Sequence, residues 1–105
     1  MRYIKEQNPE TVTLVRMGLQ ATSHSDEDDF CADYIEALLL NKPVDEQDIL
    51  KRLVASPFSK RFFDPAKPWN PESDFHLCLD FNRFNFVLRA DIHQGEISGL
   101  TSIPI

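Results

Sequence analysis

The stretch Phe84-Asn85-Phe86-Val87-Leu88-Arg89-Ala90-Asp91-Ile92 decides the fold class, because its apolar side chains recur at every second residue. A period of two is typical of a β-strand with one apolar face, whereas the segments before it follow helical spacings of three and four. Gln94-Gly95 is typical of a tight turn, and Ile97–Ile103 is expected to return as the second strand. These residues predict an antiparallel hairpin at the C-terminal end of the chain.

Five helical segments are predicted upstream of this hairpin. Each combines an apolar stripe with a start or stop signal, such as a capping side chain, a first-turn proline or a terminal Asn-Pro. Ser25, Asp45 and Ser73 are the predicted N-caps. The segments are Tyr3–Gln7, the stretch from Ser25 to the stop at Asn41-Lys42-Pro43, Glu46–Ala55, the short stretch from Pro57 to Phe62, and the stretch that follows Ser73.

One further strand is predicted at Thr11–Val15, a β-branched run between Pro9 and Gly18. A short apolar run bounded by such residues is typical of an interior strand of a sheet. The sequence thus predicts an α/β protein. Its expected form is a partial three-layer α/β/α fold, in which helices flank a short sheet and a C-terminal antiparallel hairpin follows.

The composition is that of a globular protein. The chain has 105 residues, of which 42% are hydrophobic and 27% charged, and is expected to form a single domain over residues 1–105. Cys31 and Cys78 have no metal or redox spacing and are predicted as buried, reduced thiols in a cytoplasmic protein. Trp69 lies in a proline-rich loop and is expected to pack onto the domain. No stretch is long and apolar enough to predict a membrane span.

The net charge of −6 is concentrated in one segment. More than half of the seventeen acidic residues lie between residues 24 and 48, where Lys42 is the single base. An acidic chain repels phosphate backbones, so we expect no binding to nucleic acid. The acidic segment has two interpretations: it attracts a divalent cation, or it is a solvated helix face.

Ser25-Asp26-Glu27-Asp28-Asp29 is the one local cluster with residues suited to chemistry. Carboxylates are hard oxygen ligands for Mg²⁺, but acids in a first helical turn also stabilise the helix dipole without any ligand. His24 adjoins this turn and is either a catalytic group or an exposed loop residue. Arg52, Lys60 and Arg61 form a small basic patch that either grips anions or is ordinary surface charge.

The order of these motifs resembles a known enzyme family. The chain has Val12-Thr13-Leu14-Val15, then Gly18, then Ser25-Asp26-Glu27-Asp28 and Cys31-Ala32, and later Asp74-Phe75-His76-Leu77-Cys78-Leu79. This series resembles the C-terminal part of the 2-phosphosulfolactate phosphatase family, with a V-T-L-V strand, a turn glycine and an S-x-E-D element that opens a helix. Arg16-Met17 and Asp33 depart from residues common in the family at those places. The family's N-terminal D-x-L-R-A-[ST]-[ST] stretch has no counterpart here.

The resemblance implies a Mg²⁺-dependent phosphatase, a hydrolase of phosphoric monoesters. The family's reaction converts 2-phosphosulfolactate to sulfolactate and phosphate, a step of coenzyme M biosynthesis. Glu27 and Asp28 match the family's E-D pair, which implies roles in catalysis and as metal ligands, and Gly18 matches the turn glycine, which implies a role in substrate binding. The expected substrate is a small anionic phosphorylated hydroxy acid.

The chain also fits a different class of protein. Because it matches only the C-terminal portion of a longer phosphatase, it is expected to act with a missing N-terminal part or as a homo-oligomer. The alternative to an enzyme is a truncated, non-catalytic α/β module that acts only in assembly with a partner chain. The isolated chain is therefore expected to be a weak phosphatase or an inactive one.

Overall fold

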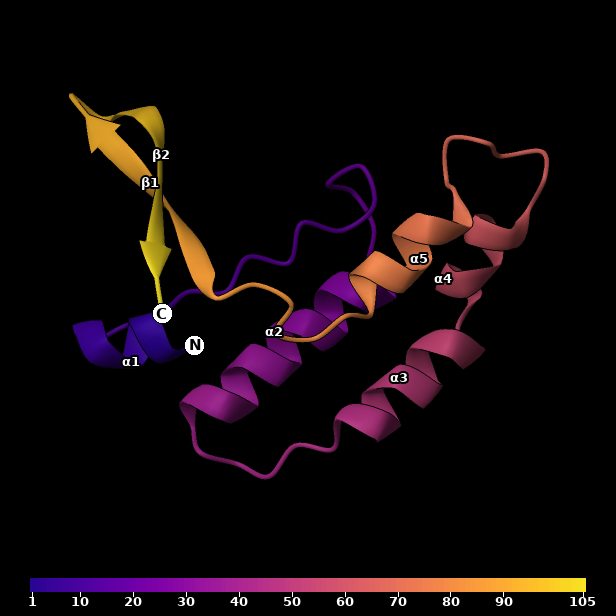
Figure 1. The fold of residues 1–105 in the computed structure, drawn as a ribbon, viewed down its shortest axis with the longest axis horizontal. Coiled ribbons are helices and arrows are strands. Elements are labelled where there is room, and N and C mark those ends of the chain that lie inside the picture. The colour runs from indigo at the N-terminus through magenta and orange to yellow at the C-terminus, as the bar shows by residue number, and fades with distance from the viewer. The chain divides into compact units, whose positions relative to one another are not determined.

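The computed structural model describes residues 1–105, which form helices, one antiparallel hairpin and connecting loops (Figure 1). The chain divides into two compact units. Unit 1 comprises Glu10–Asp80 together with Met1, and unit 2 comprises Arg2–Pro9 and Phe81–Ile105. Apart from Met1, unit 1 is thus one continuous stretch of chain inserted between the two segments of unit 2.

Unit 1 is helical, and its helices begin and end near the predicted signals. Its elements are α2 (Asp26–Leu39), α3 (Glu46–Ala55), α4 (Pro57–Lys60), the 3₁₀ helix η1 (Arg61–Phe63) and α5 (Glu72–Cys78). Asp45 caps α3, because its side chain accepts hydrogen bonds from the backbone N–H groups of Gln47 at 3.0 Å and Asp48 at 3.2 Å. The helices expected over residues 46–55 and from residue 57 are confirmed.

The stop predicted at the end of α2 is also confirmed. Asn41 adopts a left-handed conformation with φ 54°, and its backbone N–H bonds to the carbonyl of Leu38 at 3.4 Å. The N–H of Lys42 then bonds to the carbonyl of Ala37 at 2.8 Å. This pair of bonds is a Schellman motif, which satisfies carbonyl groups that the helix end leaves unpaired.

The core of unit 1 is a small aromatic cluster at the junction of α3, α4, η1 and α5. Leu53, Phe58, Phe62 and Phe75 are buried together, and Phe30, Ile49 and Leu79 pack against them. The rings of Phe58 and Phe62 meet edge to face with centroids 5.1 Å apart. This cluster fixes the position of η1 against the helices that precede it.

Unit 2 contains α1 (Arg2–Gln7) and the hairpin of β1 (Phe86–His93) and β2 (Glu96–Pro104). Gln94 and Gly95 both have positive φ, 51° and 81°, which is the geometry that a two-residue hairpin turn requires. The predicted hairpin is confirmed, with a β-bulge between Asp91 and Ile92. Alternation also holds: on one face, Arg89 and Thr101 both donate hydrogen bonds to the carboxylate of Asp91. The hydrogen bonds from Thr101 and then Arg89 lower the pKa of Asp91 below its usual range.

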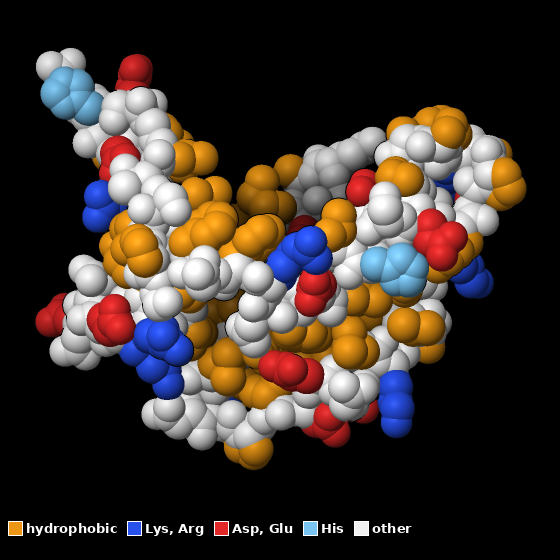
Figure 2. Space-filling model, in the orientation of Figure 1, with side chains coloured by type: hydrophobic (Ala, Val, Ile, Leu, Met, Phe, Trp, Pro, Cys, Tyr) orange, Lys and Arg blue, Asp and Glu red, His pale blue; other side chains and the backbone are white.

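The apolar face of the hairpin is exposed. Four of its side chains are 61–70% exposed, whereas Phe86 at the start of β1 is 36% exposed; the four are Leu88, Ile92, Ile97 and Leu100. Apolar side chains likewise occupy much of the surface turned to the viewer in Figure 2. The alternation identified the strand correctly, but it did not establish that a core covers the apolar face.

The strand predicted at Thr11–Val15 is wrong. This segment has no regular secondary structure, and Val15 is 74% exposed. A strand needs a neighbouring strand for its backbone N–H and C=O groups, and the single sheet of the structure pairs β1 with β2 alone. The structure is a mixed α/β protein as predicted, whereas the three-layer arrangement stays a prediction.

Three smaller expectations need correction. The helix expected to be capped by Ser73 begins earlier, at Glu72, with Pro71 at the N-cap position. Cys31 and Cys78 are exposed free thiols and not core residues, and Trp69 is 70% exposed. A small core leaves these apolar side chains without neighbours to bury them. None of the helices is both long and apolar enough to cross a membrane.

Candidate functional site

The loop before α2 is a tight turn that depends on Gly18. The N–H of Leu19 bonds to the carbonyl of Ser23 at 2.8 Å, and Gln20 and Ala21 between them both have positive φ. Gly18 has φ 70°, and a Cβ added to it would lie 2.3 Å from the carbonyl oxygen of Ser23. Only glycine fits this backbone without a shift of the loop.

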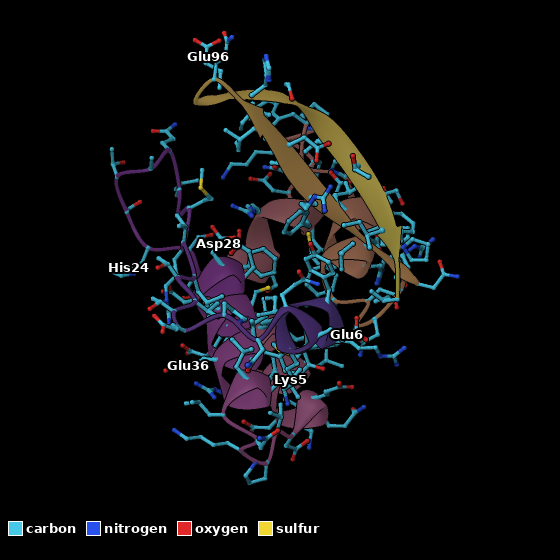
Figure 3. The ribbon with its side chains drawn as sticks, turned by 90° about the vertical axis from the view of Figure 1, so that its left-hand side faces the viewer. Lys5, Glu6, His24, Asp28, Glu36 and Glu96 are labelled. Atoms are coloured by element: carbon cyan, nitrogen blue, oxygen red, sulfur yellow. The ribbon has the colours of Figure 1, made fainter.

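The structure brings the predicted residues Gly18 and Asp28 together. The backbone N–H of Gly18 donates a hydrogen bond of 2.7 Å to Oδ2 of Asp28. In Figure 3, Asp28 lies at the N-terminal end of α2, and His24 lies on the loop that leads into it. One side chain of the acidic turn therefore anchors the glycine turn through a charge-assisted hydrogen bond.

Glu27 has a different partner from Asp28. Its Oε1 accepts a hydrogen bond of 2.7 Å from Nη2 of Arg61, which lies in η1. Successive residues of a helix are about 100° apart around its axis, so neighbouring carboxylates point in different directions. The two predicted metal ligands thus make separate contacts, one to the loop and one to η1.

A third acid of the turn ties the loop to the helix. Asp29 pairs with Nη1 of Arg16 at 3.3 Å and with Nδ1 of His24 at 3.1 Å, and Arg16 also bonds to Asp33. The hydrogen bonds to Asp33 and then Asp29 raise the pKa of Arg16 above its usual value, so it stays charged. The side chain of His24 is 90% exposed, as expected for a loop residue.

A cleft of about 380 Å³ opens beside the start of α2. Its wall on the loop side is formed by Leu19 and residues 24–27, and its opposite wall by Pro57, Phe58 and Arg61. We call it the α2 cleft. All of its lining residues belong to unit 1. Of the predicted site residues, Glu27 lines it, whereas Asp28 and Gly18 do not.

Arg61 is the site residue that the sequence pattern did not single out. The sequence showed it only as a member of a basic patch with Arg52 and Lys60. Its pairing with Glu27 spans 34 positions of the chain. No local spacing in the sequence encodes such a contact. The weak signal for a role of Arg61 is its position in the sequence between two phenylalanines, Phe58 and Phe62.

The acidic turn offers carboxylate oxygens, the type of donor atom that a magnesium ion takes. Oε2 of Glu27 is buried and has no hydrogen-bond partner, so one carboxylate oxygen remains unused. No group of three or more His, Cys, Asp and Glu residues lies together as a metal cluster. Mg²⁺ commonly takes one or two carboxylates and completes its shell with water and phosphate oxygens, so the donors present match this habit and not that of zinc.

Both cysteine thiols have a pKa above the usual value of a thiol. Desolvation raises the pKa of Cys31, with a further contribution from Asp28, and desolvation followed by the charge of Glu27 raises that of Cys78. The thiolate is the reactive form, and a raised pKa lowers its population. Thiol chemistry is therefore a poor match to this site.

Comparisons with protein-family models, with curated proteins and with solved structures found no match to this chain.

Proposed function

We propose that this chain is the C-terminal portion of a cytoplasmic Mg²⁺-dependent phosphatase that hydrolyses the phosphomonoester of a small anionic hydroxy acid similar to 2-phosphosulfolactate. The observation that carries the proposal is the 2.7 Å hydrogen bond from Gly18 to Asp28. The resemblance includes a turn glycine, Gly18, and an E-D pair, Glu27-Asp28. The hydrogen bond joins Gly18 to Asp28, which lies ten positions further along the chain. Such a contact is expected if both belong to one site.

The roles follow from the chemistry of these groups. Asp28 and Glu27 would hold Mg²⁺, and the turn at Gly18 would lie against the substrate. Bound Mg²⁺ would neutralise charge on the phosphoryl oxygens. Asp28 also holds the turn in place through the Gly18 N–H. An asparagine oxygen at this position could still accept that bond, so loss of the charge would weaken the hold on the metal more than the turn.

The test combines Mg²⁺ titration with a phosphatase assay on phosphorylated hydroxy acids, run on the chain alone and with the N-terminal part of a family member added. Glu27→Gln and Asp28→Asn keep side-chain size but remove the charge that holds a hard cation. We expect each to weaken Mg²⁺ binding by about tenfold or more and to lower kcat at an almost unchanged melting temperature.

Glu36→Gln is the matched control, because Glu36 lies on the same helix and none of the contacts at the acidic turn involves it. It should leave Mg²⁺ binding and activity unchanged. Equal Mg²⁺ affinity in all four proteins, without phosphatase activity in either arm, would refute the proposal.

A second function has its own supporting observation. Only five apolar residues are buried, whereas many large apolar side chains are exposed, including the face of the hairpin. Exposed apolar patches of this kind mark surfaces that bind other proteins. The second candidate is thus a non-catalytic module that acts in assembly with a partner chain or a second copy.

A further inference from the structure

The α2 cleft contains a polar group without a partner. Ser25 lies at the N-cap position of α2 and lines the cleft, and it is only 9% exposed. Its side chain makes no capping bond to the helix, and its hydroxyl has no other hydrogen-bond partner. On the opposite wall, Nε of Arg61 is buried and also has no hydrogen-bond partner. Buried polar atoms are nearly always hydrogen-bonded, so this unpaired donor, together with a hydroxyl that is free to bond, points to a ligand.

Across the cleft, Arg61 supplies a fixed positive charge. Its guanidinium lies over the rings of Phe58 and Phe62, 4.9 Å from each centroid, and is held by Glu27 at 2.7 Å. Its side chain is 29% exposed. Stacking on two rings and one ion pair restrict the guanidinium to one position, so little entropy is lost when it binds an anion.

The arrangement of donors defines the class of ligand. The first N–H groups of α2 have no partner within the helix, and the Ser25 hydroxyl and Arg61 guanidinium add donors on either side of the cleft. Donors that line one cleft, beside the positive end of a helix dipole, suit a tetrahedral oxyanion. Two carboxylates line the same cleft: the charge of Glu27 is paired with Arg61, whereas Asp26 forms no ion pair and opposes an anion.

We propose that the α2 cleft binds a phosphate or sulfonate group through Ser25 and Arg61, with Glu27 as the positioning residue that holds Arg61. The inference rests on the proposed function, since it identifies the part of the chain that grips the substrate's anionic groups. It adds two residues to the site that the resemblance does not supply. It also implies that Asp26 weakens anion binding, because its negative charge repels the ligand.

The test is titration of the full chain with inorganic phosphate, and separately with methanesulfonate, in the presence of a metal chelator, followed by amide NMR shifts. Arg61→Gln and Ser25→Ala should each weaken anion binding by about tenfold, because each variant removes a hydrogen-bond donor. Arg61→Gln also removes a positive charge. Asp26→Asn should strengthen it several-fold. Saturation by one ligand and not the other tells which anionic group the cleft takes.

Lys60→Ala is the matched control, because Lys60 is an exposed cation beside Arg61 that does not line the cleft. It should bind as the unaltered chain does. The opposite sign expected for Asp26→Asn keeps the test valid if Arg61→Gln disturbs the fold, since misfolding cannot strengthen binding. For Glu27, Glu27→Ala should weaken phosphate binding more than Glu27→Gln, whose amide oxygen can still accept from Arg61.

Three results would overturn the inference: no saturable binding of either anion, equal loss in Lys60→Ala, or no change in Arg61→Gln and Ser25→Ala. Its failure is distinct from failure of the proposed function. Phosphatase activity that these variants leave intact would sink the anion site alone. Anion binding as expected in a chain without Mg²⁺ binding or activity would sink the phosphatase and leave the anion site standing.

Discussion

At the scale of single residues, Gly18 limits what the site loop can accommodate. Its φ is positive, and the space where a side chain would begin is occupied by the Ser23 carbonyl. Its N–H also supplies the bond to Asp28. A residue under both constraints is expected to tolerate no side chain, whatever the loop binds.

We predict that Gly18→Ala destabilises the chain by about 1–3 kcal/mol, from the positive φ and the close carbonyl together. Chemical denaturation measures the free energy of unfolding, and the amide shift of residue 18 reports the bond to Asp28. Gly99→Ala is the control, because a Cβ there meets nothing within 4 Å. Equal effects of the two substitutions would show that the turn adjusts freely.

The residues of the site differ in how far the sequence could reveal them. Gly18, Glu27 and Asp28 stood out because a motif order resembling a family marked them. Arg61 did not, because its role comes from a contact across 34 positions and from stacking on the aromatic core. Ser25 was identified as an N-cap by position, yet its side chain makes no capping bond, because the residue type alone does not decide which way the hydroxyl bonds.

At the scale of elements, the sequence predicted the helix ends and the hairpin turn correctly where local interactions determine them. Helix α3 begins and ends at the predicted residues because Asp45 caps it, and the hairpin turns at Gln94-Gly95 because both residues adopt positive φ. Thr11–Val15 has strand propensity but no partner strand, and pairing is not a local property. Ser73 fails as a cap because Pro71 takes that position two residues earlier.

This difference between caps can be measured. We predict that Asp45→Ala costs about 1 kcal/mol of stability, because two backbone N–H groups of α3 lose their acceptor. Ser73→Ala should cost less than about 0.5 kcal/mol, because Ser73 lies inside α5 and does not cap it. Urea unfolding followed by circular dichroism compares the two. A larger loss for Ser73→Ala would contradict the assignment of the caps.

At the scale of the whole molecule, burial is unusually low. Five apolar residues are buried in a chain of which 42% is hydrophobic, and no large side chain is less than 2% exposed. Burial of a large apolar side chain contributes about 1.5–3 kcal/mol, so the exposed ones represent stabilisation that an assembled state would recover. The sequence indicated enough apolar residues for a core, but it could not indicate which of them one chain buries by itself.

We therefore predict that the 12.1 kDa chain associates with a second copy as its concentration rises. Leu100→Ser and Ile97→Ser, on the apolar face of the hairpin, should weaken association at least tenfold, whereas Val54→Ser, an exposed apolar site on α3, should not. Sedimentation velocity over a range of concentrations measures the change. A monomer at every concentration would count against self-assembly through this face.

The insertion of unit 1 within unit 2 has a consequence for the order in which the chain is made. Tyr3 of α1 interacts with Arg89 of β1, so α1, which is made before Glu10–Asp80, must wait for a strand that is made after that stretch. Loop-closure entropy grows slowly with length, and closing a loop of this size costs about 2 kcal/mol more than closing a ten-residue one. Synthesis therefore delivers the whole α2 cleft, and the helices around it, before unit 2 can close.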